Sequence, residues 1–198
     1  MNRSFPGLAL LFLSLVTAVT AQESPAPVQI EIRTELGPIT LELYPSSAPV
    51  TVTNFLRYVD GGFFAGGSFH RTVHQGNQPN DSIRIAVIQG DINGGMGGHR
   101  FGSIDLERTH LTGLQHVDGT ISMARDGPDT ATSSFFICVG DQPELDYGGR
   151  RNPDGQGFGA FGVVLEGMDV VRAINRSPAE GQNLTPPIKI LDVIRVGS

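Results

Sequence analysis

Short apolar runs, each bounded by turn-forming residues, constrain this chain more than any other feature of its sequence. Glycine, aspartate, asparagine or proline separates one apolar run from the next, and few of these runs are long enough for a long helix. The chain contains 26 glycines and 13 prolines, a content that favours many turns over a helical bundle. The pattern is typical of an antiparallel sheet or barrel, and it predicts strands at 68–73, 83–89, 120–123, 134–139 and 158–165.

Both ends of the folded region continue the strand pattern. Residues 28–33 and 39–43 alternate apolar and polar side chains on either side of Gly37-Pro38. This alternation predicts a β-hairpin with its turn at Gly37-Pro38 and one wet face. A further strand-like run covers 188–196 near the C-terminus. The whole pattern therefore predicts a mainly β domain.

Two segments have the helical spacing of apolar residues instead. One begins at Pro49, a residue suited to the first position of a helix, and continues to the glycine pair at 61–62. The other covers 168–174. Segments 75–82 and 142–156 lack a regular pattern, which predicts loops. The chain is long enough for one sizeable core and too short to favour two, so we expect one closed barrel with a helix at each end.

The N-terminus has the three parts of a secretory signal. A basic residue, Arg3, precedes an apolar run over 8–16, and small residues follow up to Ala21. The run is shorter than the ~20 residues that cross a bilayer, so a permanent membrane anchor is the weaker interpretation. We expect the signal peptide, residues 1–21, to be cleaved after Ala21 and residues 22–27 to form a flexible lead-in. The mature protein would then be periplasmic or secreted.

The net charge argues against some classes of partner. Without residues 1–21 the chain has 13 basic and 20 acidic side chains, a net charge of −7. Such a chain repels phosphate backbones and anionic lipid surfaces, so we expect no nucleic-acid partner and no membrane association after cleavage. The single cysteine, Cys138, cannot form an intrachain disulfide and lies in an apolar run. This predicts a buried thiol in a fold that its apolar core holds together.

Common catalytic and metal-binding motifs are missing from the sequence. The histidines are His70, His74, His99, His110 and His116. They form no HExxH motif and have no short spacing with cysteine, so no metal site is predicted. There is no G-x-S-x-G motif, and Ser133-Ser134 has no recognisable base partner. The glycine-rich segment 93–98 lacks the Lys-Ser/Thr pair of a phosphate-binding loop, and a mobile turn is its simplest interpretation.

Two strand-like runs carry side chains that could belong to a site. In Phe69-His70-Arg71, strand alternation predicts Phe69 and Arg71 on one face and His70 on the other. A lone arginine on a strand is usually only solvated, so Arg71 by itself carries little functional weight. The pair Phe135-Phe136 must also divide between the faces, which predicts one ring in the core and the other on the opposite surface.

Six ordered segments of the chain resemble the cyclophilin family, and they extend over essentially all of the mature chain. They are Phe-His-Arg at 69–71, Ile-Gln-Gly-Asp at 88–91, Gly-Thr-Ile-Ser-Met-Ala at 119–124, Gly-Pro-Asp-Thr at 127–130, Ser-Ser-Phe-Phe-Ile at 133–137, and Ala-Phe-Gly at 160–162 with Glu-Gly-Met-Asp-Val-Val at 166–171. Ile-Asp-Leu-Glu at 104–107 and Ala-Thr-Ser at 131–133 are similar to the short single-domain bacterial branch.

The resemblance implies a mainly β fold over residues 28–198, a closed eight-stranded antiparallel β-barrel capped by two α-helices. It also implies peptidyl-prolyl cis-trans isomerase activity, in a substrate groove on the outer wall of the barrel. No cofactor, nucleophile or covalent intermediate is required. The partners would be proline-containing segments of unfolded or exported proteins. Because the sequence has no obvious apolar surface patch, we expect a monomer.

The family's functional residues have counterparts in this chain. Arg71 matches the family's catalytic arginine, Gln89 its groove glutamine, and Phe136 the aromatic floor of its proline pocket. Phe135 is then the core partner of Phe136. Two positions beside the substrate backbone and one on the pocket wall are matched by Ala124, Arg125 and Leu145.

Other positions that line the family's pocket depart from its usual residues. Ala86-Val87 stands where the family commonly has Phe-Met, and Ser134 stands where it commonly has glutamine. The family's pocket histidine aligns near Phe158. A polar loop is inserted at 75–83. These changes are expected to reshape the proline pocket, and the absence of tryptophan is expected to weaken binding of cyclosporin, a ligand of the family.

Two functions stay open on the sequence. The first is an active isomerase that acts on X-Pro bonds in exported proteins, which Arg71 and Phe136 favour. The second is a catalytically weak or inactive proline-peptide binding module or chaperone, which Ala86, Val87 and Ser134 favour. Measurement of peptide isomerisation would separate them.

Overall fold

The computed structural model describes residues 1, 24–79, 82–96 and 101–197. The predicted signal peptide beyond Met1, its cleavage site after Ala21 and part of the predicted glycine-rich turn at 93–98 lie outside these residues. Residues 24–27 are exposed and have no regular secondary structure. Within the described ranges, no helix is long and apolar enough to cross a membrane.

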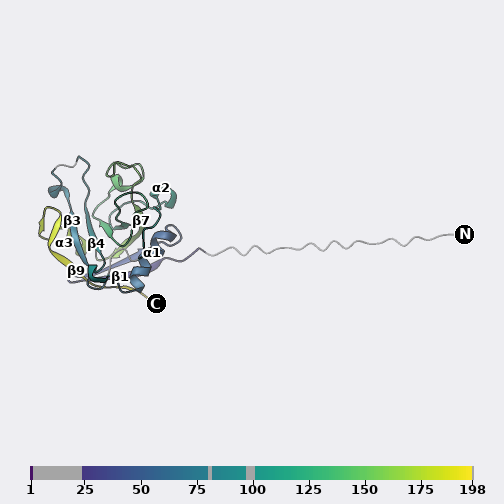
Figure 1. Cartoon of the computed structure of the whole chain (residues 1–198), viewed down its shortest axis with the longest axis horizontal. Helices are drawn as coiled ribbons and strands as arrows, with labels where there is room; N and C mark the ends of the chain where they lie inside the picture. Colours follow the sequence, from purple (N-terminus) through teal and green to yellow (C-terminus); the bar gives the residue numbers. More distant parts are fainter. Residues whose placement is uncertain (2–23, 80–81, 97–100, 198) are drawn as a thin grey trace.

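Eight antiparallel strands form a closed barrel, which confirms the predicted β fold (Figure 1). In order around the barrel they are β1 (Val28–Thr34), β2 (Gly37–Leu43), β7 (Gly159–Glu166), β5 (Thr120–Met123), β6 (Phe135–Cys138), β4 (Val87–Asp91), β3 (Ser68–Val73) and β9 (Asn183–Arg195). Pairing of β1 with β9 closes the ring. A two-residue strand, β8 (Ala179–Glu180), pairs with the start of β9.

The turn of the first hairpin differs from the predicted one. Thr34 pairs with Gly37, so the turn consists of Glu35 and Leu36, and Gly37 already belongs to β2. The Thr34 side chain fixes this turn, because its Oγ1 accepts from Leu36 N at 3.1 Å and donates to Gly37 O at 2.8 Å. Gly37 has a φ of +136°, and a Cβ there would lie 2.9 Å from a Val170 methyl group. Glycine is therefore favoured both by this backbone conformation, which other residues rarely adopt, and by the close approach of Val170.

The strand predicted at 83–89 begins later, at Val87, because the side chain of Gln78 forms the hydrogen bonds of the backbone at Ile85. Gln78 is buried, and its Oε1 accepts from Ile85 N at 3.1 Å while its Nε2 donates to Ile85 O at 2.8 Å. The backbone of Ile85 is thus hydrogen-bonded to an amide side chain and not to a neighbouring strand. Gln78 anchors the inserted polar loop beside the start of β4.

Helices α1 (Pro49–Asp60) and α3 (Met168–Asn175) confirm the two predicted helices. They pack against different strands, α1 against β7 and β9, and α3 against β2, β3 and β4. A third helix, α2 (Thr109–Thr112), forms a single turn that is too short to give a periodic signal. The segments predicted as loops contain the 3₁₀ turns η1 (Gln75–Asn77) and η3 (Pro143–Leu145), and η2 (Gly94–Met96) lies after β4.

The first turn of α1 is capped from elsewhere in the chain. Ala48 precedes the helix, and its side chain offers no acceptor for the free N–H groups of the first helical turn. Instead, Val50 N and Thr51 N donate to the two carboxylate oxygens of Glu107, at 3.0 and 2.8 Å. A negative charge is also favourable at this end of a helix. The segment before α2 is thereby attached to α1.

Apolar side chains form two clusters, one inside the barrel and one on its outer wall. The inner cluster includes Phe55 and Phe135, whose ring centroids lie 5.6 Å apart. The outer cluster comprises Val73, Ile85, Val87, Phe136, Cys138 and Leu145. Phe135 and Phe136 therefore divide between core and outer wall as predicted. Cys138 is buried as predicted, and its burial raises the pKa of the thiol well above its ordinary value.

Candidate active site

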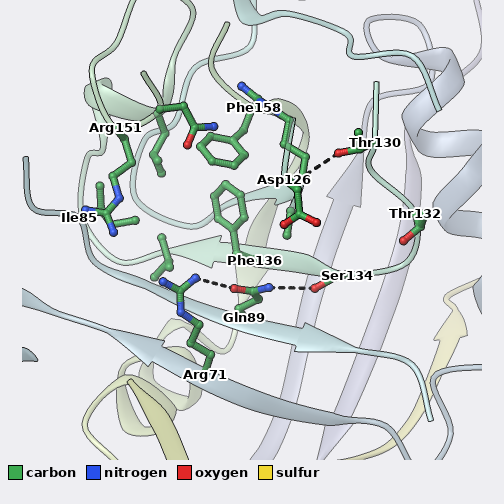
Figure 2. A pocket seen from close by; sticks show the side chains of 15 residues that line it. Arg71, Ile85, Gln89, Asp126, Thr130, Thr132, Ser134, Phe136, Arg151 and Phe158 are labelled. Carbon is green, nitrogen blue, oxygen red and sulfur yellow. Dashed lines mark hydrogen bonds between the residues drawn. The ribbon is translucent and has the colours of Figure 1, made fainter. Parts of the chain in front are cut away.

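A pocket of about 340 Å³ opens on the outer wall of the barrel, above the outer apolar cluster (Figure 2). Strands β3, β4 and β6 form one side of it, and the chain segments that follow β5 and precede β7 form the other. Its volume lies within the usual range of small-ligand pockets. The predicted site residues that line it are Arg71, Val87, Gln89, Ala124, Arg125, Ser134, Phe136, Leu145 and Phe158.

A β-bulge turns Arg71 to the outer wall. Phe69 pairs with Gly90 and Arg71 with Gln89, so His70 is an extra residue in β3. Beyond the bulge the alternation of faces is reversed. The prediction that Phe69 and Arg71 share a face is therefore wrong, since Phe69 lies in the inner cluster and Arg71 lines the pocket.

The guanidinium of Arg71 is held by a chain of hydrogen bonds that crosses from β3 to β4 and on to the residue before β6 (Figure 2). Arg71 Nη1 donates to Gln89 Oε1 at 2.9 Å, and Gln89 Nε2 donates to Ser134 Oγ at 3.0 Å. Ser134 Oγ in turn contacts Gly90 O at 3.3 Å as a donor. Arginine can only donate, so this network fixes which end of the Gln89 amide faces Arg71. Ser134, a departure from the family's glutamine, orients Gln89.

Aromatic and aliphatic side chains form the floor and wall beside Arg71. Phe136 is 5 % exposed, and its ring meets that of Phe158 edge-on, with centroids 5.3 Å apart. Leu145 and Val87 are buried next to them in the outer cluster. The pocket thus offers an apolar recess with a guanidinium at its rim, which suits a small apolar ring attached to a polar backbone.

Arg125 lines the pocket but its charge is used within the protein. Its side chain is 1 % exposed, and its guanidinium nitrogens donate to both carboxylate oxygens of Asp154 at 2.8 and 2.9 Å and to Gly157 O at 2.8 Å. The guanidinium also lies 5.1 Å from the centre of the Phe158 ring. The hydrogen bonds from Arg125 lower the pKa of Asp154. Arg125 therefore fixes the loop that carries Phe158.

Ala86 is the predicted site residue that does not reach this pocket. Neighbouring residues on an extended chain point to opposite sides, and Val87 points into the pocket. Ala86 lines a separate hollow with His74 and Asn175. Ile85, two residues before Val87, lines the pocket instead, and the period of two along this segment could have identified it.

Apart from Ile85, the lining residues that were not predicted come from loops and carry no periodic signal. Arg151 and Ile85 lie on one side of Phe136, while Asp126 and two threonines lie on the other (Figure 2). The two sides of the pocket therefore carry different polar side chains, Arg151 on one and Asp126 with the threonines on the other. The lining residues that sequence reasoning missed are Ile85, Asp126, Thr130, Thr132, Arg151 and Asn152.

A Ser-His-Asp arrangement, of which the serine and the histidine are buried, lies directly behind the pocket floor. His116 Nδ1 is 2.7 Å from Asp146 Oδ1, and His116 Nε2 is 3.0 Å from Ser122 Oγ. The His116 ring stacks on Phe136 with centroids 5.9 Å apart. Ser122 is fully buried, so its hydroxyl cannot reach a substrate, and this arrangement supports the floor. In the described part of the chain, no group of three or more His, Cys, Asp or Glu side chains could hold a metal ion.

Comparisons with known proteins agree with this geometry. Residues 28–195 match the family described as "Cyclophilin type peptidyl-prolyl cis-trans isomerase/CLD". A protein of Acinetobacter baylyi named "Peptidyl-prolyl cis-trans isomerase" is 33 % identical over 174 residues, 85 % of each chain. "Peptidyl-prolyl cis-trans isomerase A" of Dickeya dadantii is 32 % identical over 181 residues, 91 % of this chain and 88 % of that protein.

The fold is also that of solved cyclophilin structures. The crystal structure of a Cryptosporidium parvum cyclophilin type peptidyl-prolyl cis-trans isomerase superposes with a TM-score of 0.69 at 22 % identity, covering 87 % of this chain and 99 % of that one. A second structure of the same protein, in the presence of the dipeptide Ala-Pro, gives a TM-score of 0.68. With the family match over residues 28–195, these findings establish that the chain belongs to the cyclophilin-type peptidyl-prolyl cis-trans isomerases.

Proposed function

We propose that this protein isomerises X-Pro bonds of exported proteins, with Arg71 as the donor that stabilises the twisted bond. The observation that carries the proposal is the position of Arg71, at the rim of an apolar recess and hydrogen-bonded to Gln89. Isomerase activity is the activity of the family to which the chain belongs. The role of each residue and the export of the protein are the parts that we add.

The chemistry requires only that the twisted bond be stabilised. Rotation about a peptide bond faces a barrier of roughly 18–20 kcal/mol, because resonance gives the C–N bond partial double-bond character. In the twisted state the resonance is lost, and the prolyl nitrogen becomes pyramidal and basic. A guanidinium that donates to this nitrogen favours the twisted state over both planar states, which is the condition for catalysis. Arg71 keeps its proton at any ordinary pH, so the donor is always available.

The apolar recess would hold the proline ring while the preceding carbonyl rotates. Phe136 offers its ring face and Leu145 its side chain, both almost completely buried beneath the pocket. Burial of an apolar ring on such a surface is favourable and needs no directed hydrogen bond. The ring can therefore stay in place while the peptide on its N-terminal side turns. Proline-containing segments of unfolded proteins are the substrate class that these features favour.

A binding module without catalytic rate is the competing function. The small side chain of Val87, which replaces the methionine common in the family, favours it, because a wider recess would hold the ring less tightly. The Gln89–Ser134 hydrogen bond argues the other way, since it keeps the Arg71 acceptor oriented although the family's glutamine is missing. We therefore favour the active isomerase.

Export is supported by the N-terminal pattern. Arg3, the apolar run at 8–16 and the small residues before Gln22 have the arrangement of a cleaved signal. Mass spectrometry of protein recovered from the periplasm or the medium should find Gln22 at the N-terminus. Recovery of intact Met1 in cytoplasmic material alone would contradict export.

Exchange spectroscopy on a short X-Pro peptide tests the catalytic proposal. Catalytic amounts of the protein should accelerate the interconversion of cis and trans forms well above the uncatalysed rate, which has a time constant of tens of seconds or longer. A titration with the same peptide gives its Kd. Binding without acceleration would establish the binding module, and neither binding nor acceleration would overturn both functions.

A further inference from the structure

Arg71 has a second glutamine partner that is remote in the sequence. Gln182 lies in the turn between β8 and β9, and its Oε1 accepts from Arg71 Nε at 3.0 Å and from Arg71 Nη2 at 2.6 Å. Gln89 accepts from the third guanidinium nitrogen, Nη1. The two glutamines therefore contact all three nitrogens of the group that we place next to the prolyl nitrogen.

Hydrogen bonds fix both the backbone and the side-chain amide of Gln182. Its backbone O accepts from Thr72 N at 2.9 Å, directly beside Arg71 in β3. Its Nε2 donates to Asn77 O at 3.4 Å. Because arginine has no acceptor, the oxygen of the amide must face Arg71 and the nitrogen must face Asn77. The amide of Gln182 thus has one orientation that satisfies both partners.

Asn77 connects the inserted loop to this arrangement. Its Nδ2 donates to Thr72 O and to Gly181 O, both at 3.0 Å, and its Oδ1 accepts from His74 N at 2.8 Å. One side chain thus joins β3, η1 and the β8–β9 turn. The loop at 75–83, an insertion relative to the family, supports the turn that carries Gln182.

We propose that Gln182 is a positioning residue for isomerisation, holding the guanidinium of Arg71 in its productive orientation before the peptide binds. An arginine side chain has many rotamers, and a donor that is oriented in advance needs no reorganisation as the bond twists. Gln182 is also neutral, so it orients the cation without forming an ion pair that would compete with the substrate. The inference rests on the proposed function, because it assumes that Arg71 acts on the peptide.

The test variant is Gln182→Met, which keeps the length and unbranched shape of the side chain and removes the amide oxygen. We expect the maximal isomerisation rate to fall about ten-fold, since small misplacements of a catalytic group have large effects on rate. The peptide Kd should stay within about two-fold, because Gln182 does not line the apolar recess. Gln182→Asn, which withdraws the oxygen by one carbon, should also lower the rate and serves as a second variant if Gln182→Met folds poorly.

The matched control is Gln156→Met. Gln156 Oε1 accepts from Arg108 Nε at 2.6 Å, the same kind of contact on an arginine that does not line the pocket. Its loss should leave the maximal rate and the peptide Kd unchanged. If the maximal rate fell similarly in Gln182→Met and Gln156→Met, the loss of any such hydrogen bond would be enough to disturb the barrel. That result would overturn a specific role for Gln182.

A double-mutant cycle separates positioning from a structural role. If Gln182 acts through Arg71, Gln182→Met should have no further effect on the rate in the Arg71→Ala background. An equal fall in both backgrounds would overturn the inference, as would full activity of both Gln182→Met and Gln182→Asn. Failure of the proposed function itself is distinguishable, because Arg71→Ala would then isomerise the peptide as fast as the parent protein.

Discussion

Replacement of Phe136 by alanine should affect stability and peptide binding together. The ring is 5 % exposed and packs between His116 and Phe158, with centroid distances of 5.9 and 5.3 Å. Truncation of a buried phenylalanine costs about 3–5 kcal/mol in a closed core. Phe136 borders an open pocket that water can fill, so we expect the lower end, ~3 kcal/mol. For a domain of this size each kcal/mol shifts Tm by about 2–4 °C, which gives a fall of roughly 6–12 °C.

Calorimetry and peptide titration measure the two effects on the same sample. Loss of the floor removes apolar contact with the proline ring worth ~1.4 kcal/mol or more, so the Kd of an X-Pro peptide should rise at least about ten-fold. Phe136→Leu, which keeps most of the apolar volume, should lose less of both. Lower stability with unchanged peptide affinity would refute the assignment of Phe136 as the pocket floor. Unchanged Tm would refute the packing argument.

Two further predictions concern residues next to the pocket. The hydrogen bonds from Arg125 lower the pKa of Asp154 below its ordinary 3.8. The ion pair therefore stabilises the fold above pH 3.8, and this stabilisation is lost as the pH falls through the lowered pKa. The difference in unfolding free energy between the parent and Asp154→Asn, measured in urea, should shrink from pH 6 to pH 3, and a constant difference would contradict a stabilising role of the Arg125–Asp154 pair. Cys138 should react slowly with alkylating agents in the native state, because burial raises the pKa of its thiol, and Cys138→Ala should keep isomerase activity; fast labelling with loss of activity would mean that the thiol is accessible and functional.

Local pattern was sufficient for much of the fold. Pro49 marks the start of α1 because its fixed φ and missing N–H suit the first helical position. The adjacent rings of Phe135 and Phe136 had to face opposite sides of β6, and one lies in the core while the other lies in the pocket. The inference needed only the strand period and no knowledge of the neighbouring strands.

The features that were predicted wrongly or not at all depend on contacts between residues that are distant in the sequence or on side-chain hydrogen bonds, which a local pattern does not contain. The bulge at His70 reverses the alternation of β3, and it follows from pairing with β4, which is distant in the sequence. Ile85 is held by the side chain of Gln78 and not by a strand, so β4 starts late. Gln182 reaches Arg71 across 111 positions of the sequence, and nothing near either residue indicates the contact.

The most direct test of the account is the isomerisation rate of Arg71→Ala with a short X-Pro peptide. A charge-assisted hydrogen bond is worth ~1.5–3 kcal/mol, and each ~1.4 kcal/mol of barrier changes the rate ten-fold. We therefore predict a fall in kcat/KM of roughly ten- to 150-fold with Tm nearly unchanged, because Arg71 lies at the pocket rim and not in either apolar cluster. Arg71→Lys should also lose most of the activity, since an ammonium cannot reproduce the planar donor group. A folded Arg71→Ala protein that isomerises the peptide as fast as the parent would contradict the account.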